Sequence, residues 1–309
     1  MGSALRSRWR VTVPEKKERP TPSLRARLLG RRLRALREDR GLTLKYVAAS
    51  LGLDFTSVRL LEVGEWKSHR GEVLKLLDLY GVHDPGERDF LLRLARDVYR
   101  LPAWEGDFNA SQLDVSTLDG LWLESVAERI RCYQAALIPD LLRIPEYAEA
   151  VVHREHASRA SEVELAWRVR AYSRRQREVF DRRPQVDIHA VVAEAALHRP
   201  VGAPDPLWRA QLEHLAKGGD GGRVQVRVLP TTAAYVSGMD GSFTVFDLPH
   251  EQVPVVASRP HLDSIAVHEG AAGQWHVDTF DRLWDEALPA VESARLITAL
   301  VEDRSTHSN

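Results

Sequence analysis

The sequence has almost no cysteine and no long hydrophobic run, and each absence excludes a class of protein. Cys132 is the one cysteine among 309 residues, which rules out an internal disulfide and a metal site built from several cysteines. We expect Cys132 to be a small core residue on an amphipathic helix rather than a nucleophile. No apolar stretch is long enough to span a bilayer, and residues 1–13 alternate basic and apolar side chains, unlike a secretory signal. We therefore expect a cytoplasmic protein with no membrane partner.

The sequence motifs of familiar enzymes are also missing. The chain shows no nucleophile elbow, dinucleotide-binding fingerprint or pair of catalytic carboxylates. The glycine run at 218–222 lacks the Lys-Ser/Thr continuation of a phosphate-binding loop, and His153 and His156 have metal-binding spacing without a third ligand. We predict no catalytic, cofactor or metal site. An active site without a recognised motif would leave no such pattern.

Charge is distributed unevenly along the chain. The formal net charge is −1, but residues 1–40 contain 13 Lys and Arg against 4 Asp and Glu, which leaves 30 against 40 for residues 41–309. Such a basic segment favours contact with phosphates, and a merely solvated tail is the alternative. Residues 1–22 combine this charge with three prolines, so we predict a flexible basic arm.

Residues 41–64 have the pattern of a helix-turn-helix. Thr43 and Asp54 can cap two successive helices, Gly52 provides the sharp turn between them, and Gly64 ends the second. The second helix would then be held at an angle to the first and could enter a DNA major groove. The apolar faces that support this reading consist of Leu44, Val47, Ala48 and Leu51 in the first helix and Leu53, Val58 and Leu61 at the second.

The exposed positions of the second of these helices are the predicted DNA readers. Arg59 suits guanine, Thr56 and Ser57 can reach bases or phosphates, and Phe55 can contact a thymine methyl group. Because one such module covers one half-site, we expect a homodimer on double-stranded DNA. Contacts to the DNA backbone are predicted for Lys45, Lys67, Arg31 and Arg34.

Helical periodicity continues on both sides of this motif. It predicts helices over 24–38, 71–80 and 85–100, and a break follows at 101–107. We therefore predict three segments: a basic flexible arm at 1–22, a helix-turn-helix domain at 23–104 and an effector- or partner-binding domain at 105–309. The first domain should be all-α with five helices.

The second domain mixes helical and extended patterns and is predicted to be α+β. The expected helices cover 121–137, 145–156, 161–183 and 206–216, and further helices close the chain. The helix over 161–183 is dense in arginine, for which we favour a solvated face over an anion-binding wall. The expected strands cover 186–192, 224–229, 242–248, 253–258 and 264–268.

With these residues in place, the chain resembles the actinobacterial Xre-type (Cro/repressor-like) regulators of the WhiJ-like kind. This resemblance implies a transcription factor, often dimeric, whose C-terminal domain takes input from a small molecule or a small partner protein. On this basis the candidate effector- or partner-binding residues are Arg143, Tyr147, Arg170 and Arg174. Besides the helix-turn-helix, the matching segments are 138–142, 146–148, Arg170, 174–176, 194–197, Gln211, Leu212, Leu215, 227–230, Gly241 and Phe243.

Several departures from the family pattern weaken the DNA-binding surface. Leu44 and Leu60 stand where relatives usually carry a glutamine and a basic residue, and Asp54 adds a negative charge near the DNA. Residues 41–85 hold five basic against six acidic residues, so affinity would depend on the arm and on the arginines of the helix over 24–38. In the second domain, Asp140, Arg143 and Ile144 replace Gly, Gln and Thr of a Pro-Gly-Leu-Leu-Gln-Thr run.

These departures keep two alternatives open. The first is a protein-interaction or small-molecule-binding protein whose helix-turn-helix no longer binds DNA. The second is an enzyme or an RNA-binding factor recruited from the same scaffold.

Overall fold

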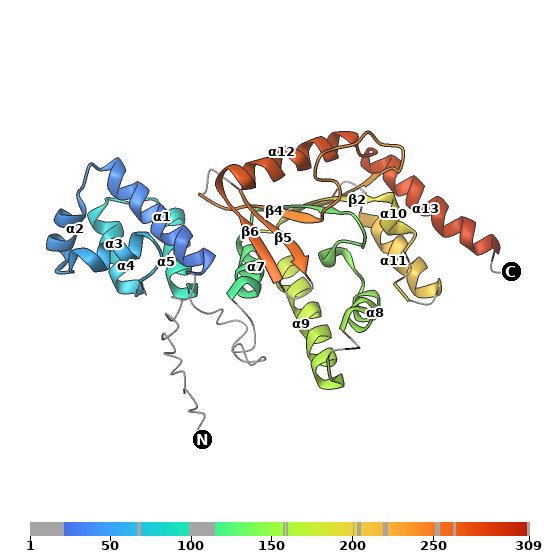
Figure 1. Cartoon of the computed structure of the whole chain (residues 1–309), viewed down its shortest axis with the longest axis horizontal. Helices are drawn as coiled ribbons and strands as arrows, with labels where there is room; N and C mark the ends of the chain where they lie inside the picture. Colours follow the sequence, from blue (N-terminus) through green and yellow to red (C-terminus); the bar gives the residue numbers. More distant parts are fainter. Residues whose placement is uncertain are drawn as a thin grey trace, which may run out of the picture.

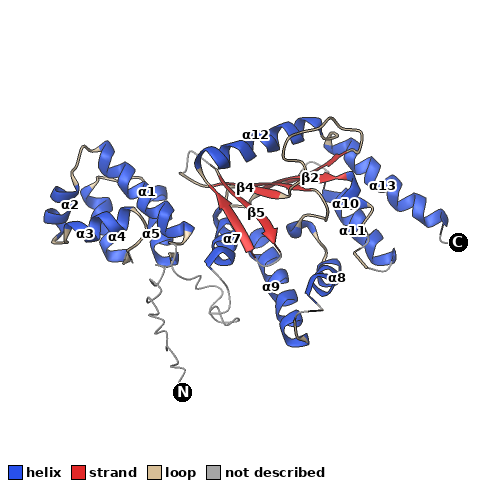
Figure 2. Cartoon of the chain, in the orientation of Figure 1, coloured by secondary structure: helices blue, strands red, loops and turns tan. Residues whose placement is uncertain are grey.

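A computed structural model describes residues 22–66, 69–98, 115–156, 158, 160–199, 201–202, 205–218, 222–250, 254–261 and 264–307. Helices alone form one end of the molecule, and a sheet with surrounding helices forms the other (Figures 1 and 2). The predicted arm apart from Pro22, the predicted domain boundary near 104 and Lys67 lie outside the described residues.

The N-terminal domain contains the five helices that periodicity predicts. They are α1 (Leu24–Asp39), α2 (Leu44–Leu51), α3 (Phe55–Glu62), α4 (Arg70–Leu79) and α5 (Pro85–Asp97). The side chains of Ser23, Thr43 and Asp54 cap α1, α2 and α3 by accepting hydrogen bonds from backbone N–H groups. Gly52 ends α2 in the left-handed conformation, with φ of 65°. The helix-turn-helix is therefore formed as the sequence predicts.

A very close crossing joins α1 to α3. A Cβ atom added at Gly30 would lie 2.5 Å from the carbonyl oxygen of Leu61 and 2.6 Å from that of Glu62. Gly64, just after α3, has φ of +78°, and a Cβ atom added there would lie 2.9 Å from the carbonyl carbon of Ala26 and 2.9 Å from the backbone nitrogen of Arg27. Glycines on both segments thus allow the two backbones to touch.

The C-terminal domain is α+β and is built on a six-stranded mixed sheet. Its strands are β1 (Arg129–Gln134), β2 (Asp187–Ala193), β3 (Val224–Leu229), β4 (Phe243–Asp247), β5 (Val255–His261) and β6 (Ser264–His268). The order across the sheet is β3-β2-β1-β4-β5-β6. β1, β2 and β3 are mutually parallel, whereas the pairs β1–β4, β4–β5 and β5–β6 are antiparallel.

Helical crossovers account for the parallel half of the sheet. The 3-10 helix η2 (Asp140–Leu142), α8 (Pro145–His156) and α9 (Glu162–Asp181) connect β1 to β2. The helices α10 (Glu194–Leu197) and α11 (Asp205–Gly218) connect β2 to β3. The helix α7 (Val115–Val126) precedes β1, and α12 (Gly270–Glu286) and α13 (Ala290–His307) follow β6. Among the described residues, no helix is both long and apolar enough to cross a membrane.

The prediction of one helix over 121–137 is wrong. The helix α7 ends at Val126, and β1 begins at Arg129. Ile130 and Tyr133 fit the helical spacing of Trp122, but β1 lies between β2 and β4 and therefore makes backbone hydrogen bonds on both sides. This pairing determines the local conformation more strongly than the apolar period. Cys132 is buried as expected, but on a strand rather than on a helix.

Helices cover both faces of the sheet (Figure 1). The helix α12 packs on one face, where Phe280 and Leu283 meet Tyr133, Val191 and Val245. On the other face a second core joins the sheet to α8, α11 and α13. A third core runs from the N-terminal helices through α7 to Ile130 and Phe246, so the two domains share one continuous apolar cluster.

The α1–α3 crossing gives a direct prediction for stability. Gly30→Ala should lower the free energy of unfolding by about 1–3 kcal/mol, because the new methyl group must push α3 away from α1. The matched control is Gly71→Ala, since Gly71 lies in α4 with nothing within 4 Å of the added carbon. The control should be neutral or stabilising by up to about 1 kcal/mol. Urea unfolding followed by circular dichroism measures both, and equal losses would contradict the close crossing.

The burial of Cys132 gives a second prediction. Burial raises the pKa of its thiol to about 12, and the nearby carboxylates of Asp140 and Glu124 add to the effect. We expect no reaction of the folded protein with a disulfide reagent at pH 8, because the thiolate is the reactive form. In guanidinium chloride the thiol should react fully. Rapid labelling of the native protein would show that Cys132 is accessible.

Candidate nucleic-acid interface and ligand pocket

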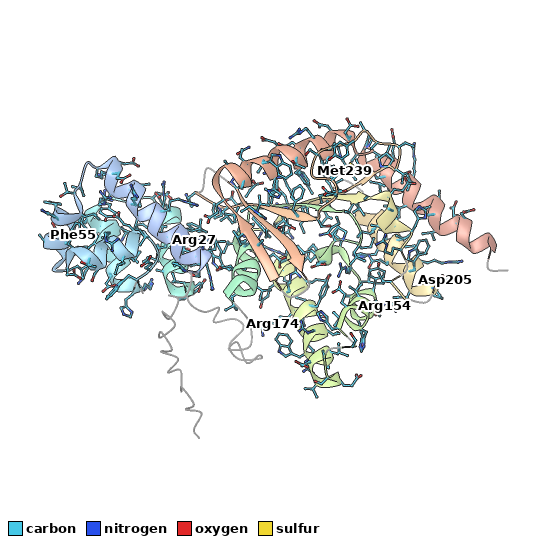
Figure 3. The ribbon with its side chains drawn as sticks, viewed as in Figure 1. Arg27, Phe55, Arg154, Arg174, Asp205 and Met239 are labelled. Atoms are coloured by element: carbon cyan, nitrogen blue, oxygen red, sulfur yellow. The ribbon has the colours of Figure 1, made fainter. Side chains whose placement is uncertain are left out.

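Three of the four residues predicted to contact DNA bases are exposed on the outer face of α3. Phe55 is 45% exposed, and Thr56 and Arg59 are also exposed. Arg59 makes no ion pair with the described residues, so its guanidinium group is available to a ligand. Phe55 lies at the end of the helical domain that points away from the second domain (Figure 3). This face therefore presents side chains suited to base edges.

The fourth predicted reader, Ser57, belongs to the cap of α3. Its hydroxyl donates a hydrogen bond to the Asp54 carboxylate, which also accepts from the N–H groups of Thr56 at 2.7 Å and Ser57 at 3.1 Å. These bonds, with that of the Ser57 hydroxyl the strongest, hold the pKa of Asp54 below its usual value. Asp54 therefore stays charged, and its negative charge at the N-terminus of α3 interacts favourably with the helix dipole.

A buried ion pair fixes the inner face of α3. Arg37 of α1 donates from Nε to Glu62 Oε1 at 2.6 Å and from an Nη atom to Oε2 at 2.9 Å. It also donates to the carbonyl of Leu42, in the segment between α1 and α2, at 2.8 Å. The bond to Glu62 raises the pKa of Arg37. This bidentate pair orients both helices of the motif relative to α1.

Each of the six arginines of α1 forms an ion pair within the protein, and Arg27 and Arg31 share one carboxylate. The pairs are Arg25–Asp119, Arg27–Glu269, Arg31–Glu269, Arg32–Glu87, Arg34–Glu38 and Arg37–Glu62. Arg31 and Arg34, both predicted to contact the DNA backbone, thus already hold carboxylates at 2.8 Å. Lys45 is exposed and has no such pair among the described residues. The positive charge of α1 is therefore much less available to phosphates than the sequence suggests.

Two of these carboxylates belong to the second domain and join it to α1. Asp119 of α7 accepts from Arg25 Nε at 2.8 Å and from the N–H of Leu24 at 2.7 Å, and the side chains of Arg25 and Asp119 are 1% and 5% exposed. Glu269, the residue before α12, binds Arg27 and Arg31. Arg27 lies where the two domains meet (Figure 3). We call Asp119 and Glu269 the α1 clasps.

The second domain contains a pocket of about 340 Å³ beside α7. One wall is charged and consists of Glu124, Asp140, Arg143 and Arg175. Arg175 donates to both oxygens of Glu124 and to Asp140 Oδ2 at 3.2 Å, and Arg143 lies 2.8 Å from Asp140 Oδ1. Burial opposes the charge of Arg175, but Glu124 and Asp140 outweigh it and raise its pKa. The ion pairs hold this wall in a fixed arrangement.

The pocket lining also includes apolar residues. They include Leu121 of α7, Leu137 after β1, and sheet residues Phe243, Phe246 and Ile265. A concave site lined by both apolar and polar residues is typical of small-molecule binding. A second hollow, of about 520 Å³, lies beyond η2 between α9 and α11 and shares Arg143 with the first.

The four candidate effector residues do not come together at one site. Arg143 is buried and lines both hollows, whereas Tyr147 is a core residue that is 1% exposed. Arg170 is exposed on α9, and Arg174 pairs with Glu178. The solvated-face prediction is thus right for Arg170 and wrong for Arg175, which is held inside the pocket wall.

Sequence reasoning did not identify Glu124 or Arg175 as site residues. Glu124 is a carboxylate in an otherwise apolar helical stretch, and it is 7% exposed. A buried carboxylate needs a partner, which is the signal that could have pointed to a basic residue nearby. The structure supplies Arg175 as that partner from a helix 51 residues further along the chain. In the described part of the chain, no cluster of His, Cys, Asp or Glu is arranged to hold a metal ion.

Two family models match separate segments of the chain. Residues 118–299 match the model of a family described as a domain of unknown function, DUF5753. The chain belongs to the DUF5753 family. Residues 28–91 match a second model, described as a helix-turn-helix domain, which extends from α1 into α5. No curated protein and no solved structure matches the chain. The DUF5753 segment begins in α7, so it contains the lining of the pocket.

The buried Arg37–Glu62 pair can be tested in this DUF5753 protein. Glu62→Gln should lower the free energy of unfolding by up to about 3–5 kcal/mol, because it removes the bidentate partner of a buried guanidinium group, which keeps only the half-exposed carboxylate of Glu38 at 3.3 Å. Asp89→Asn is the matched control: its carboxylate pairs with Arg93 in solvent on α5 and does not contact Arg37, so the unfolding midpoint should barely move. Chemical denaturation measures both. Similar small effects would mean that Glu62 does not anchor α3.

Proposed function

We propose that this protein is a sequence-specific DNA-binding transcriptional regulator whose DUF5753 domain takes input from a ligand or a small partner protein. It would act by binding rather than by catalysis. The observation that carries the proposal is the geometry of α3. Its inner face is fixed by Val58, Leu61 and the Arg37–Glu62 pair, and its outer face presents Phe55, Thr56 and Arg59. A rigidly held helix with an open polar face is what major-groove reading requires.

The match to a helix-turn-helix domain over residues 28–91 supports this function. A single α3 can cover one half-site, so we propose a homodimer that reads two half-sites about one helical turn apart. The closer relationship to Xre-type, WhiJ-like regulators rests on sequence patterns such as those at 138–142 and 174–176, and it is part of the proposal.

The second candidate is a protein whose helix-turn-helix no longer binds DNA. The pairing of the six α1 arginines favours it, because phosphate contacts supply much of the affinity of DNA-binding proteins. Selection from random duplex DNA at two salt concentrations separates the candidates. Enrichment of one sequence, with affinity that falls as salt rises, supports the regulator, and no enrichment supports the alternative.

Substitutions on α3 and α2 test the assigned roles. Arg59→Ala should weaken binding to the selected sequence by about 1–3 kcal/mol, roughly 5-fold to 150-fold, and should relax the preference at one base pair. Lys45→Ala should weaken binding to all sequences similarly and should lower the salt slope by about 1. Both effects are measurable by fluorescence anisotropy with labelled duplexes.

Arg282→Ala is the control for charge, because Arg282 is exposed on α12 of the other domain. We expect no change in DNA affinity for this variant. If Arg59→Ala left both affinity and sequence preference intact, α3 would not be the reading helix.

A further inference from the structure

We propose that the pocket beside α7 binds a small organic amine, and that α7 and β6 transmit its occupancy to the helix-turn-helix domain through the α1 clasps. This inference rests on the proposed function for its regulatory part. The binding part stands on the pocket alone.

The charges around the pocket select a cation. Three carboxylates line it, those of Glu124, Asp140 and Glu155, against the two guanidinium groups of Arg143 and Arg175. Arg175 is already bound by Glu124 and Asp140, and Arg143 is bound by Asp140. An anionic ligand would have to displace these carboxylates from their arginines. A protonated amine can instead donate to carboxylate oxygens, which accept more than one hydrogen bond each.

The remaining lining suits the body of such a ligand. The apolar part of the lining includes the ring of Phe246 and the side chains of Leu121, Leu137 and Ile265. Gln134 also lines the pocket, and its amide makes no hydrogen bond with the described residues. The volume of about 340 Å³ is at the small end of the range for ligand sites. The site therefore fits a compact aromatic or aliphatic amine.

The helix α7 and the strand β6 both line the pocket, and residues in or next to them bind α1 of the N-terminal domain. Gly120, Leu121 and Glu124 of α7 line the pocket, and the adjacent Asp119 binds Arg25 and the N–H of Leu24. Ile265 of β6 lines it as well, and Glu269 follows that strand.

The helix α7 and the strand β6 are in close contact with each other. A Cβ atom added at Gly120 would lie 2.7 Å from Ile265 Cδ1. An occupant that moved α7 or β6 would therefore move a clasp.

Calorimetry on the full chain tests ligand binding with matched probes. Tryptamine and phenethylamine carry the required positive charge, and indole-3-acetate is an anion with the same ring as tryptamine. We expect at least one amine to bind ten times more tightly than indole-3-acetate. No detectable binding of either amine, or equal or tighter binding of the anion, would overturn the proposal.

A pocket-filling variant locates the site. Ala136 lines the pocket, so Ala136→Phe should lower the amine affinity at least tenfold. Ala166→Phe is the matched control, because Ala166 is exposed on α9 outside the pocket, and its affinity should equal that of the wild type. Circular dichroism confirms that both variants are folded. Unchanged binding by folded Ala136→Phe would place the amine elsewhere.

The regulatory part is tested with and without DNA. A saturating amine should change the affinity for the selected duplex at least fivefold and should change hydrogen exchange in residues 24–39. Asp119→Asn should retain amine binding but lose both responses. If this variant does not fold, Glu269→Gln, which removes the more exposed clasp, should halve the exchange response or more. Full responses in a clasp variant, or none in the wild type, would overturn the transmission route.

The two readouts separate this proposal from the proposed function. If the protein selects no DNA sequence while the amine binds and alters exchange in α1, the DNA-binding function fails and the pocket assignment stands. If DNA is selected and no amine binds, the reverse holds.

Discussion

The position of α1 is the constraint on which the rest of the structure depends. Within the N-terminal domain, Arg37 and Gly30 of α1 fix α3 by a buried bidentate ion pair and by backbone contact. Toward the second domain, Arg25 is buried against Asp119 of α7. Removing either buried carboxylate would leave a buried guanidinium group without its principal counter-charge, which is costly in a low-dielectric interior. One helix therefore sets both the position of α3 and the attachment of the N-terminal domain to the DUF5753 domain.

This arrangement changes the electrostatic character of the N-terminal domain. The sequence places many arginines in the segment before the helix-turn-helix, but carboxylates from α1, α3, α5, α7 and the start of α12 take up the six in α1. Those arginines are structural as well as basic. Within the described part of the N-terminal domain, exposed groups such as Lys45 and Arg59 have no such pairs, so the count of basic residues there overstates the charge available to phosphates.

The sequence predicted the N-terminal domain almost completely, because its signals are local: apolar residues at helical spacing, capping side chains at Ser23, Thr43 and Asp54, and a left-handed glycine at Gly52. It predicted most strands of the second domain but missed β1, since a central strand is determined by neighbours far along the chain. The pocket was missed for the same reason. Glu124 and Arg175 are distant in sequence, and only the folding of α9 against α7 brings them together.

The sequence separation of the α1 contacts has a consequence for synthesis on the ribosome. Arg37 and Arg32 find their partners Glu62 and Glu87 within the first hundred residues, so the N-terminal domain can close as soon as it emerges. The partner of Arg25 is synthesised only at residue 119, and the shared partner of Arg27 and Arg31 only at residue 269, near the end of the chain. Until then, Arg25, Arg27 and Arg31 of the newly made N-terminal domain lack these carboxylate partners. The six arginines of α1 therefore have all these carboxylate partners only once residue 269 has been synthesised.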